Sequence, residues 1–147
     1  MSWVLLPVAL TAGIVLPLQF GVNSELRTFV GGPVAAAAIS FVVGTVALAV
    51  AVLVVQRSMP EPASVASAPW WAWTGGLLGA FFVLASIILT PRLGAATTIG
   101  LILTGQVLAS IVIDHFGLIR VPVHEASLPR IIGALLIVAG VVIVQRF

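Results

Sequence analysis

The sequence predicts an all-α membrane protein with five transmembrane helices, and composition and hydropathy carry this prediction. Of the 147 residues, 61% are hydrophobic and only 7% are charged, against roughly 25% charged residues in an average soluble domain. Uncharged stretches of about 20 residues, the length that a spanning helix needs, recur along the chain. Hydrocarbon offers the backbone no hydrogen-bond partners, so a chain that crosses it repeatedly is expected to do so as helices.

The spans are expected at about residues 3–23, 34–55, 70–90, 94–113 and 128–145, in a single transmembrane domain covering residues 1–147. The first lacks the basic start and the cleavage site of a signal peptide, so we expect it to be retained. Pro17 inside it should kink the helix or leave a carbonyl without its donor. The last begins beside Arg130, whose long side chain can reach the membrane interface.

Short connections with strong breaking signals separate the spans. Gly31, Gly32 and Pro33 follow one another after the first span. Residues 91–93 (Pro-Arg-Leu) are expected to form a tight hinge between the third and fourth spans, and residues 56–69 a loop rich in Pro, Ser and Ala. Little chain remains outside the spans, so no soluble domain is expected.

The basic residues are six arginines, and they divide evenly between the two membrane faces. Five crossings place the termini on opposite faces. The face of the N-terminus receives Arg57, Arg120 and Arg130, and the other face receives Arg27, Arg92 and Arg146. Because positive residues normally set orientation, an even division predicts that copies insert both ways and pair as an antiparallel homodimer. A chance balance among few charges is the alternative.

Polar side chains within the spans are the candidates for a solute site, because such side chains usually face the bundle interior, a partner or a water-filled cavity. Gln19 and Asn23 are one helical turn apart, and Gln106, Ser110 and Asp114 repeat that spacing in the fourth span. The candidate substrate-binding residues are Gln19, Asn23, Ser40, Gln106 and Ser110.

These candidates have structural alternatives. The hydroxyls of Ser40 and Thr45 can bond back to their own helix. Gln106 lies near the middle of its span, and its amide cannot be satisfied by its own helix alone. For Gln106, a hydrogen bond to another helix and a place in a cavity are equally open.

Charged or ionisable side chains near the ends of spans are the candidates for coupling or gating: Glu25, Arg27, Asp114 and His115. Glu25 and Asp114 are the acids closest to a span, so a proton carried by a carboxylate would be carried there. An interfacial cap or loop role is the alternative for Asp114 and His115. Glu25 and Arg27 are expected at the interface, where they can pair.

Small and aromatic residues mark the third span. Gly75 and Gly79 have the G-x-x-x-G spacing, and Gly76 with Ala80 repeats it, which favours close helix packing within one subunit over a dedicated dimer motif. The tryptophans at residues 70, 71 and 73 are typical of an interfacial aromatic belt.

Several function classes find no support in the sequence. The chain has no Cys, which excludes disulfides and thiolate metal sites. No catalytic triad, metal-ligand cluster or phosphate loop is present, so no catalytic residue, metal or cofactor is assigned. The arginines form no basic cluster, so nucleic-acid binding is not expected.

The motifs taken together resemble a known family. They are Gln19-x-x-x-Asn23 with Leu26-Arg27, Gly32-Pro33, Ser40-Phe41-x-x-Gly44-Thr45, Pro69-Trp70-Trp71-x-Trp73-x-Gly75-Gly76-x-x-Gly79-Ala80-Phe81, Pro91-Arg92-Leu93-Gly94-Ala95, and Gly105-Gln106-x-x-x-Ser110-x-x-x-Asp114-His115-Phe116-Gly117. This set, which covers almost the whole chain, resembles a bacterial family of five-helix inner-membrane proteins. That family belongs to the drug/metabolite transporter superfamily, with the ten-helix EamA-like exporters and the small multidrug resistance proteins.

The resemblance implies an architecture. Ten-helix relatives look like two five-helix halves in opposite orientation, so one five-helix chain would need a second copy or a sister subunit. An antiparallel homodimer or a heterodimer would then give the ten-helix inverted-repeat fold, with the solute bound at the interface near the midplane. The small multidrug resistance proteins carry a glutamate deep in helix one, whereas residues 11–18 here contain no acid. This departure favours a neutral or zwitterionic metabolite over cations.

We therefore expect a transporter of small organic solutes in the bacterial inner membrane, working by alternating access at a dual-topology dimer interface. A passive channel of the same architecture and a non-transporting membrane partner protein are the alternatives. Saturable turnover would favour the carrier, single-channel currents the channel, and constant copurification with one partner the third possibility.

Overall fold

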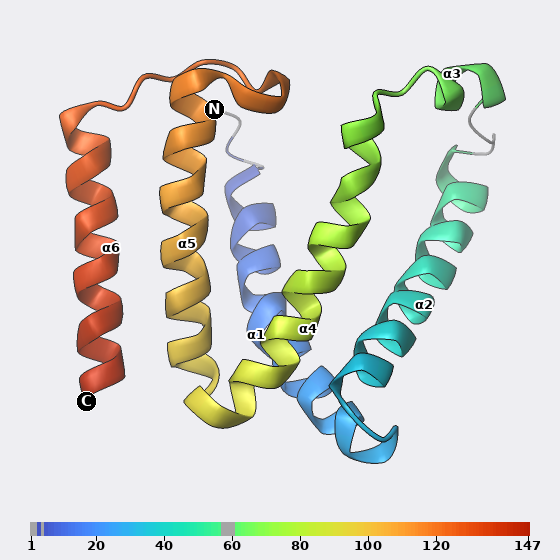
Figure 1. Cartoon of the computed structure of the whole chain (residues 1–147), viewed down its shortest axis with the longest axis horizontal. Coiled ribbons are helices and arrows are strands. Elements are labelled where there is room, and N and C mark those ends of the chain that lie inside the picture. Colours follow the sequence, from blue (N-terminus) through green and yellow to red (C-terminus); the bar gives the residue numbers. More distant parts are fainter. Residues whose placement is uncertain (1–2, 4, 57–60) are drawn as a thin grey trace. The chain divides into compact units, whose positions relative to one another are not determined.

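The computed structural model describes residues 3, 5–56 and 61–147, and every regular element in that part of the chain is a helix (Figure 1). The elements are α1 (Leu5–Phe29), α2 (Pro33–Ala51), η1 (Val52–Gln56), α3 (Pro62–Ala66), η2 (Trp70–Thr74), α4 (Gly75–Leu93), α5 (Ala95–Phe116), η3 (Leu118–Arg120) and α6 (Leu128–Arg146). Helices long and apolar enough to cross a membrane cover residues 5–29, 33–56, 70–93, 95–116 and 128–146. They confirm the predicted five-helix membrane protein. Of the arginines counted above, Arg57 lies outside the described residues.

The first connection forms where the sequence predicts it, although α1 runs further than its apolar span. The helix includes Pro17, whose missing N–H removes one bond, and continues to Phe29. Gly31 and Gly32 then take positive φ angles of 83° and 143°, which glycine adopts at little cost. Pro33 is the first residue of α2, where its missing N–H has no helical partner to lose.

Two details of the connections differ from expectation. Residues 91–93 are not a hinge: α4 contains Pro91 and ends at Leu93. The fixed φ of proline suits a helix, and near the C-terminus its ring disturbs only the last turns. The break falls instead at Gly94, with a φ of 81°. The expected loop at residues 56–69 also contains the short helix α3, which begins at Pro62.

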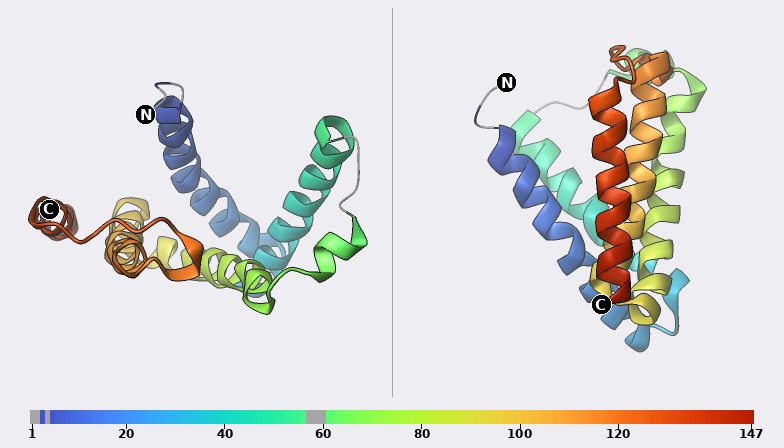
Figure 2. Two further views of the ribbon diagram at one scale, coloured as in Figure 1. Left: turned by 90° about the horizontal axis from the view of Figure 1, so that it is seen from above. Right: turned by 90° about the vertical axis from the view of Figure 1, so that its left-hand side faces the viewer.

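The chain forms two compact units, Met1–Arg92 and Leu93–Phe147. In the first unit, α1 and α2 meet at the Gly31–Gly32 turn and diverge from it (Figure 2). Small side chains make close packing possible there: Ala36 and Ala37 of α2 form a buried cluster with Val83 and Ile87 of α4. Leu26, Val30, Phe82 and Leu84 pack against this cluster.

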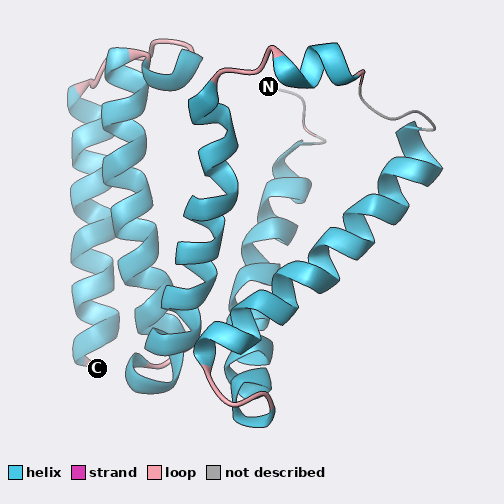
Figure 3. Ribbon diagram, turned by 45° about the vertical axis from the view of Figure 1, so that its right-hand side comes forward, coloured by secondary structure: helices cyan, strands magenta, loops and turns pink. Residues whose placement is uncertain are grey.

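The second unit is an antiparallel hairpin of α5 and α6 (Figure 3). A Cβ atom built on Gly100 of α5 would lie 3.0 Å from both γ-carbons of Val141 in α6. The absence of a side chain at Gly100 therefore sets how closely the two helices approach. Ala134 on α6 is buried.

Candidate solute-binding site

The first unit holds a small pocket with a polar wall, which we call the polar pocket. Gln19 reaches it from α1, Ser40 and Thr45 from α2, and the remaining lining is Phe41, Gly44, Leu48 and Val83. Its volume is about 210 Å³. No ionisable side chain lines it. The pocket thus joins neutral polar groups from two helices within spans that are otherwise apolar.

Helical spacing explains why the polar side chains of α1 lie on the face that points into the first unit. Phe20 and Asn23 are the buried residues of α1, with exposed fractions of 1% and 4%, and Gln19 precedes them on the same side. The ring of Phe20 packs edge-to-face against Phe82 of α4, with 5.7 Å between the ring centroids. This contact turns the inner face of α1 toward α4, so Gln19 and Asn23 point inward rather than to lipid.

The polar groups of this region lack hydrogen-bond partners among the described residues. The Nδ2 of Asn23 is buried and has no hydrogen-bond partner among the described residues. The side chains of Gln19, Ser40 and Thr45 likewise make no hydrogen bond within that part of the molecule. A membrane-embedded amide that no protein group satisfies is costly, and this is the usual mark of a ligand, a water or a second subunit.

Several hydroxyl groups in the other spans bond to their own helix. The Oγ of Ser110 donates to the Val107 carbonyl at 2.9 Å, and the Oγ1 of Thr104 donates to the Gly100 carbonyl at 3.0 Å. The hydroxyl of Ser86 bonds the Val83 carbonyl in the same way. A serine or threonine hydroxyl can satisfy its hydrogen bond within its own helix in a membrane, whereas a primary amide cannot. Ser110 therefore has a local role in α5 that does not require a solute.

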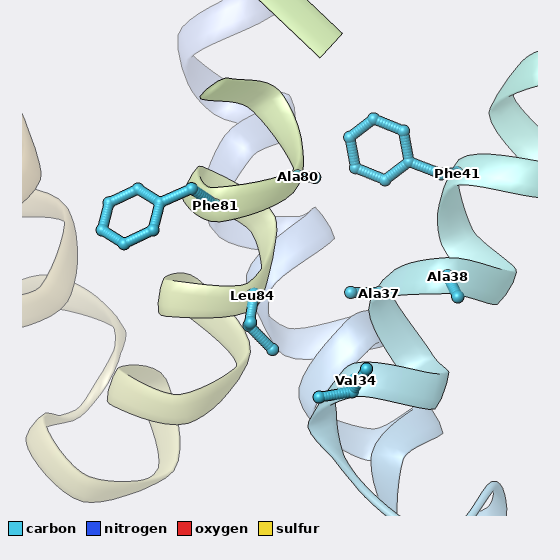
Figure 4. Close-up of a pocket in the computed structure, with 7 residues that line it drawn as sticks. All are labelled: Val34, Ala37, Ala38, Phe41, Ala80, Phe81 and Leu84. Atoms are coloured by element: carbon cyan, nitrogen blue, oxygen red, sulfur yellow. The ribbon is translucent and has the colours of Figure 1, made fainter. Parts of the chain in front are cut away.

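A larger apolar groove lies between α2 and α4 in the same unit (Figure 4). It has a volume of about 460 Å³ and no polar side chain in its lining, which consists of Val34, Ala37, Ala38, Phe41, Ala80, Phe81 and Leu84. Phe41 lines both this groove and the polar pocket, and its ring extends from α2 toward Ala80. Phe41 therefore forms the wall between the two.

Of the three packing glycines, one contacts another helix of its unit. A Cβ on Gly79 would lie 3.4 Å from the Phe41 ring, so this glycine leaves room for the wall residue of the pocket. A Cβ on Gly75 or Gly76 would meet no atom of another helix within 4 Å. The G-x-x-x-G spacing thus marks one close contact, at Gly79, and an open helix surface one turn earlier.

The charged candidates take separate places. Glu25 is exposed and makes no ion pair within the described chain, because the Nε of Arg27 donates instead to the Ser24 carbonyl at 3.2 Å. The expected pairing of Glu25 with Arg27 is therefore not formed. Asp114 belongs to the second unit, where it forms an ion pair with Arg130 at the start of α6.

Asp114 and His115 both form hydrogen bonds with the loop that follows α5. The backbone N–H of His124 donates to the Asp114 carbonyl at 2.9 Å, and Arg130 Nη1 donates to the His124 carbonyl at 2.8 Å. The Nδ1 of His115 accepts the N–H of Ala126 at 3.2 Å. This arrangement favours the structural interpretation of both residues over a buried proton relay.

Several of these features are not evident from the sequence. Leu48, Val83 and Phe41 line the polar pocket, and their apolar side chains do not distinguish them from the rest of the spans. The partner of Asp114 had a signal: Arg130 is the arginine nearest the start of the following span. Gly100 also had one, since Gly100 and Thr104 have the small-x-x-x-small spacing. Within residues 3, 5–56 and 61–147, no three His, Asp or Glu side chains gather as a metal site would require.

A family model matches the chain along most of its length, and one curated relative matches about half of it. A family model described as "Putative inner membrane exporter, YdcZ" matches residues 4–143. The inner membrane protein YdcZ of Escherichia coli (strain K12) is 42% identical over 82 residues, which are 56% of this chain and 54% of that protein. The aligned part thus spans about half the length of this curated relative. No solved structure matches the chain.

Proposed function

The chain belongs to the YdcZ family of inner-membrane proteins within the drug/metabolite transporters, and from this membership we propose that it is a secondary transporter of small organic solutes. The observation that carries the proposal is the polar pocket. Gln19, Ser40 and Thr45 line it without hydrogen-bond partners in the described chain. A solute that supplies donors and acceptors would satisfy these groups.

The lining supports a neutral or zwitterionic solute. The amide and hydroxyl groups of the pocket offer both donors and acceptors but carry no net charge. A cation or an anion would enter without a counter-charge, and an unpaired charge in a dry site is strongly disfavoured. Asn23, one turn beyond Gln19, adds an unpartnered amide donor close by in the sequence. Export, the direction that the family description names, is part of the proposal.

A two-subunit carrier agrees with the size of the pocket. A volume of about 210 Å³ is below the roughly 300–1,000 Å³ of typical ligand sites. We propose that a second copy in the opposite orientation, or a sister subunit, completes the site, and that the pair works by alternating access. The even arginine count supports the homodimer.

Glu25 and Asp114 are not proposed to share one proton pathway. They belong to different units, and counting the five spans places the end of α1 and the end of α5 on opposite membrane faces. Asp114 is also engaged by Arg130. Of the two acids, Glu25 is the one whose carboxylate is free within the described chain, so a coupling role is proposed for Glu25 first.

Transport by reconstituted protein tests the function. Purified full-length protein in liposomes should take up at least one of radiolabelled serine, glutamine or sorbitol with saturable kinetics, in preference to lysine and glutamate. The substitution Gln19→Leu should lower kcat/KM roughly 5- to 30-fold, because one or two hydrogen bonds to the solute are lost.

A matched control separates the pocket from general damage. Gln145→Leu removes the same amide from the exposed last turn of α6 and should leave uptake unchanged. Saturable uptake of lysine or glutamate alone would contradict the neutral pocket. Uptake that ignores Gln19→Leu would remove this pocket from the pathway, and single-channel currents would replace the carrier by a channel.

A further inference from the structure

Gln106 is a polar residue at the middle of α5. It is residue 12 of the 22 in Ala95–Phe116, so it lies about 1 Å from the midpoint of the helix at 1.5 Å per residue. Its side chain is exposed and makes no hydrogen bond within the described chain. Because α5 is one of the five spans, the structure has a primary amide at the centre of a membrane helix, left without a partner by its own hairpin.

The surroundings of Gln106 leave room for another helix. Gly105 and Ala109 are exposed and four residues apart, and a Cβ on Gly105 would meet nothing within 4 Å. Small residues at this spacing let membrane helices approach closely. The hydroxyls of Thr104 and Ser110 bond their own helix, so neither satisfies the amide. The group that satisfies Gln106 must come from outside this hairpin.

We propose that Gln106 pairs with Gln106 of a second, oppositely inserted copy of this chain. Inversion places a residue above the midplane in one copy against a residue equally far below it in the other. Only a residue at the midplane therefore meets its own counterpart. A primary amide is both donor and acceptor, so two of them can form reciprocal hydrogen bonds. This inference rests on the antiparallel homodimer in the proposed function and names its contact.

Cross-linking in native membranes tests the pairing, because the chain has no Cys of its own. Leu103 and Ala109 lie three residues on either side of Gln106, and both are exposed. In an antiparallel pair, position 103 of one copy faces position 109 of the other. Two copies of position 103 are instead offset by about 9 Å along the axis.

The experiment uses the full-length variants Leu103→Cys and Ala109→Cys, with tags of different size, expressed alone and together and then oxidised. We expect a disulfide dimer from the mixture and little from either variant alone. Adding Gln106→Leu to both should lower the cross-linking yield roughly three- to tenfold, as expected for the loss of interhelical hydrogen bonds. Leu101→Cys, exposed but rotated by about 140° from Gln106, is the control and should not cross-link with either.

Three outcomes would overturn the proposal. Self-cross-linking of each single variant would mean a parallel pair. No cross-linking in any combination would mean that this face of α5 is not the interface. A yield unchanged by Gln106→Leu would mean that the amides do not pair. None of these outcomes alters the expected effect of Gln19→Leu on uptake, so this interface and the transport function are tested separately.

Discussion

At the scale of single residues, the ion pair of Asp114 and Arg130 closes a small ring of bonds between α5 and α6. Arg130 binds the Asp114 carboxylate and the His124 carbonyl, and the His124 N–H binds the Asp114 carbonyl. One arginine thus holds both the end of α5 and the loop that follows it. The side chain of Arg130 is 34% exposed and that of Asp114 is 24% exposed, so water screens much of their attraction.

The substitutions Asp114→Asn and Arg130→Gln test the worth of this pair. Each should destabilise the protein in detergent, and the double variant should be more stable than the sum of the single effects predicts, with a coupling energy of roughly 0.5–1 kcal/mol. Thermal unfolding of the four proteins gives this energy. Glu125→Gln, at an exposed residue of the same loop without an ion pair in the described chain, is the control. Strictly additive effects would mean that the pair contributes nothing to stability.

At the scale of elements, the α5–α6 hairpin depends on Gly100, because Val141 occupies the space where a side chain would lie. In membranes, helices associate through such close contacts rather than through the hydrophobic effect. A branched side chain at this point must push the helices apart or force Val141 from its rotamer.

The substitution Gly100→Val should therefore destabilise the hairpin by about 1–3 kcal/mol, measured by thermal unfolding in detergent. Gly140→Val, on α6 where nothing lies within 4 Å of the added Cβ, should have a much smaller effect. Combining Gly100→Val with Val141→Ala should recover part of the loss. Equal effects at the two glycines would show that helix propensity, and not the contact with Val141, sets the cost.

Hydropathy predicted the five helices but not where each one ends. It detects the apolar part of a helix, so α1 was expected to stop near residue 23, whereas Glu25 and Arg27 continue the helix beyond its apolar part. The backbone stops only at Gly31 and Gly32, whose positive φ angles the sequence does indicate. The prediction of a hinge at residues 91–93 was wrong for a related reason. Proline near a helix end is compatible with helical φ, so Pro91 did not end the helix. The helix break at Gly94 requires only the positive φ that glycine can adopt.

At the scale of the whole molecule, the sequence identified polar groups but not which of them meet. Gln19 and Ser40 come from different helices and line one pocket, while Gln106 and Ser110 belong to the other unit. Spacing along one helix assigns residues to a face, but the contact between helices depends on small apolar residues such as Ala36 and Ala37. Those residues are too common in membrane helices to predict a partner.

Orientation in the membrane is the property of the whole chain that the arginines predict. A Ser2→Cys substitution, at a position outside the described residues, gives the only thiol in the chain. An impermeant reagent should label about half of it in intact cells, and the rest only after permeabilisation, because three arginines on each face set no preference.

Added charges should shift this orientation in a predictable direction. Thr28→Arg with Gln145→Arg adds two charges to the face opposite the N-terminus and should move labelling toward completion. Ser64→Arg with Ser67→Arg adds the same charge to the other face and should abolish it. If instead every copy of the Ser2→Cys protein faced one way, the antiparallel homodimer would be wrong, and an oppositely oriented sister subunit would have to complete the ten-helix pair.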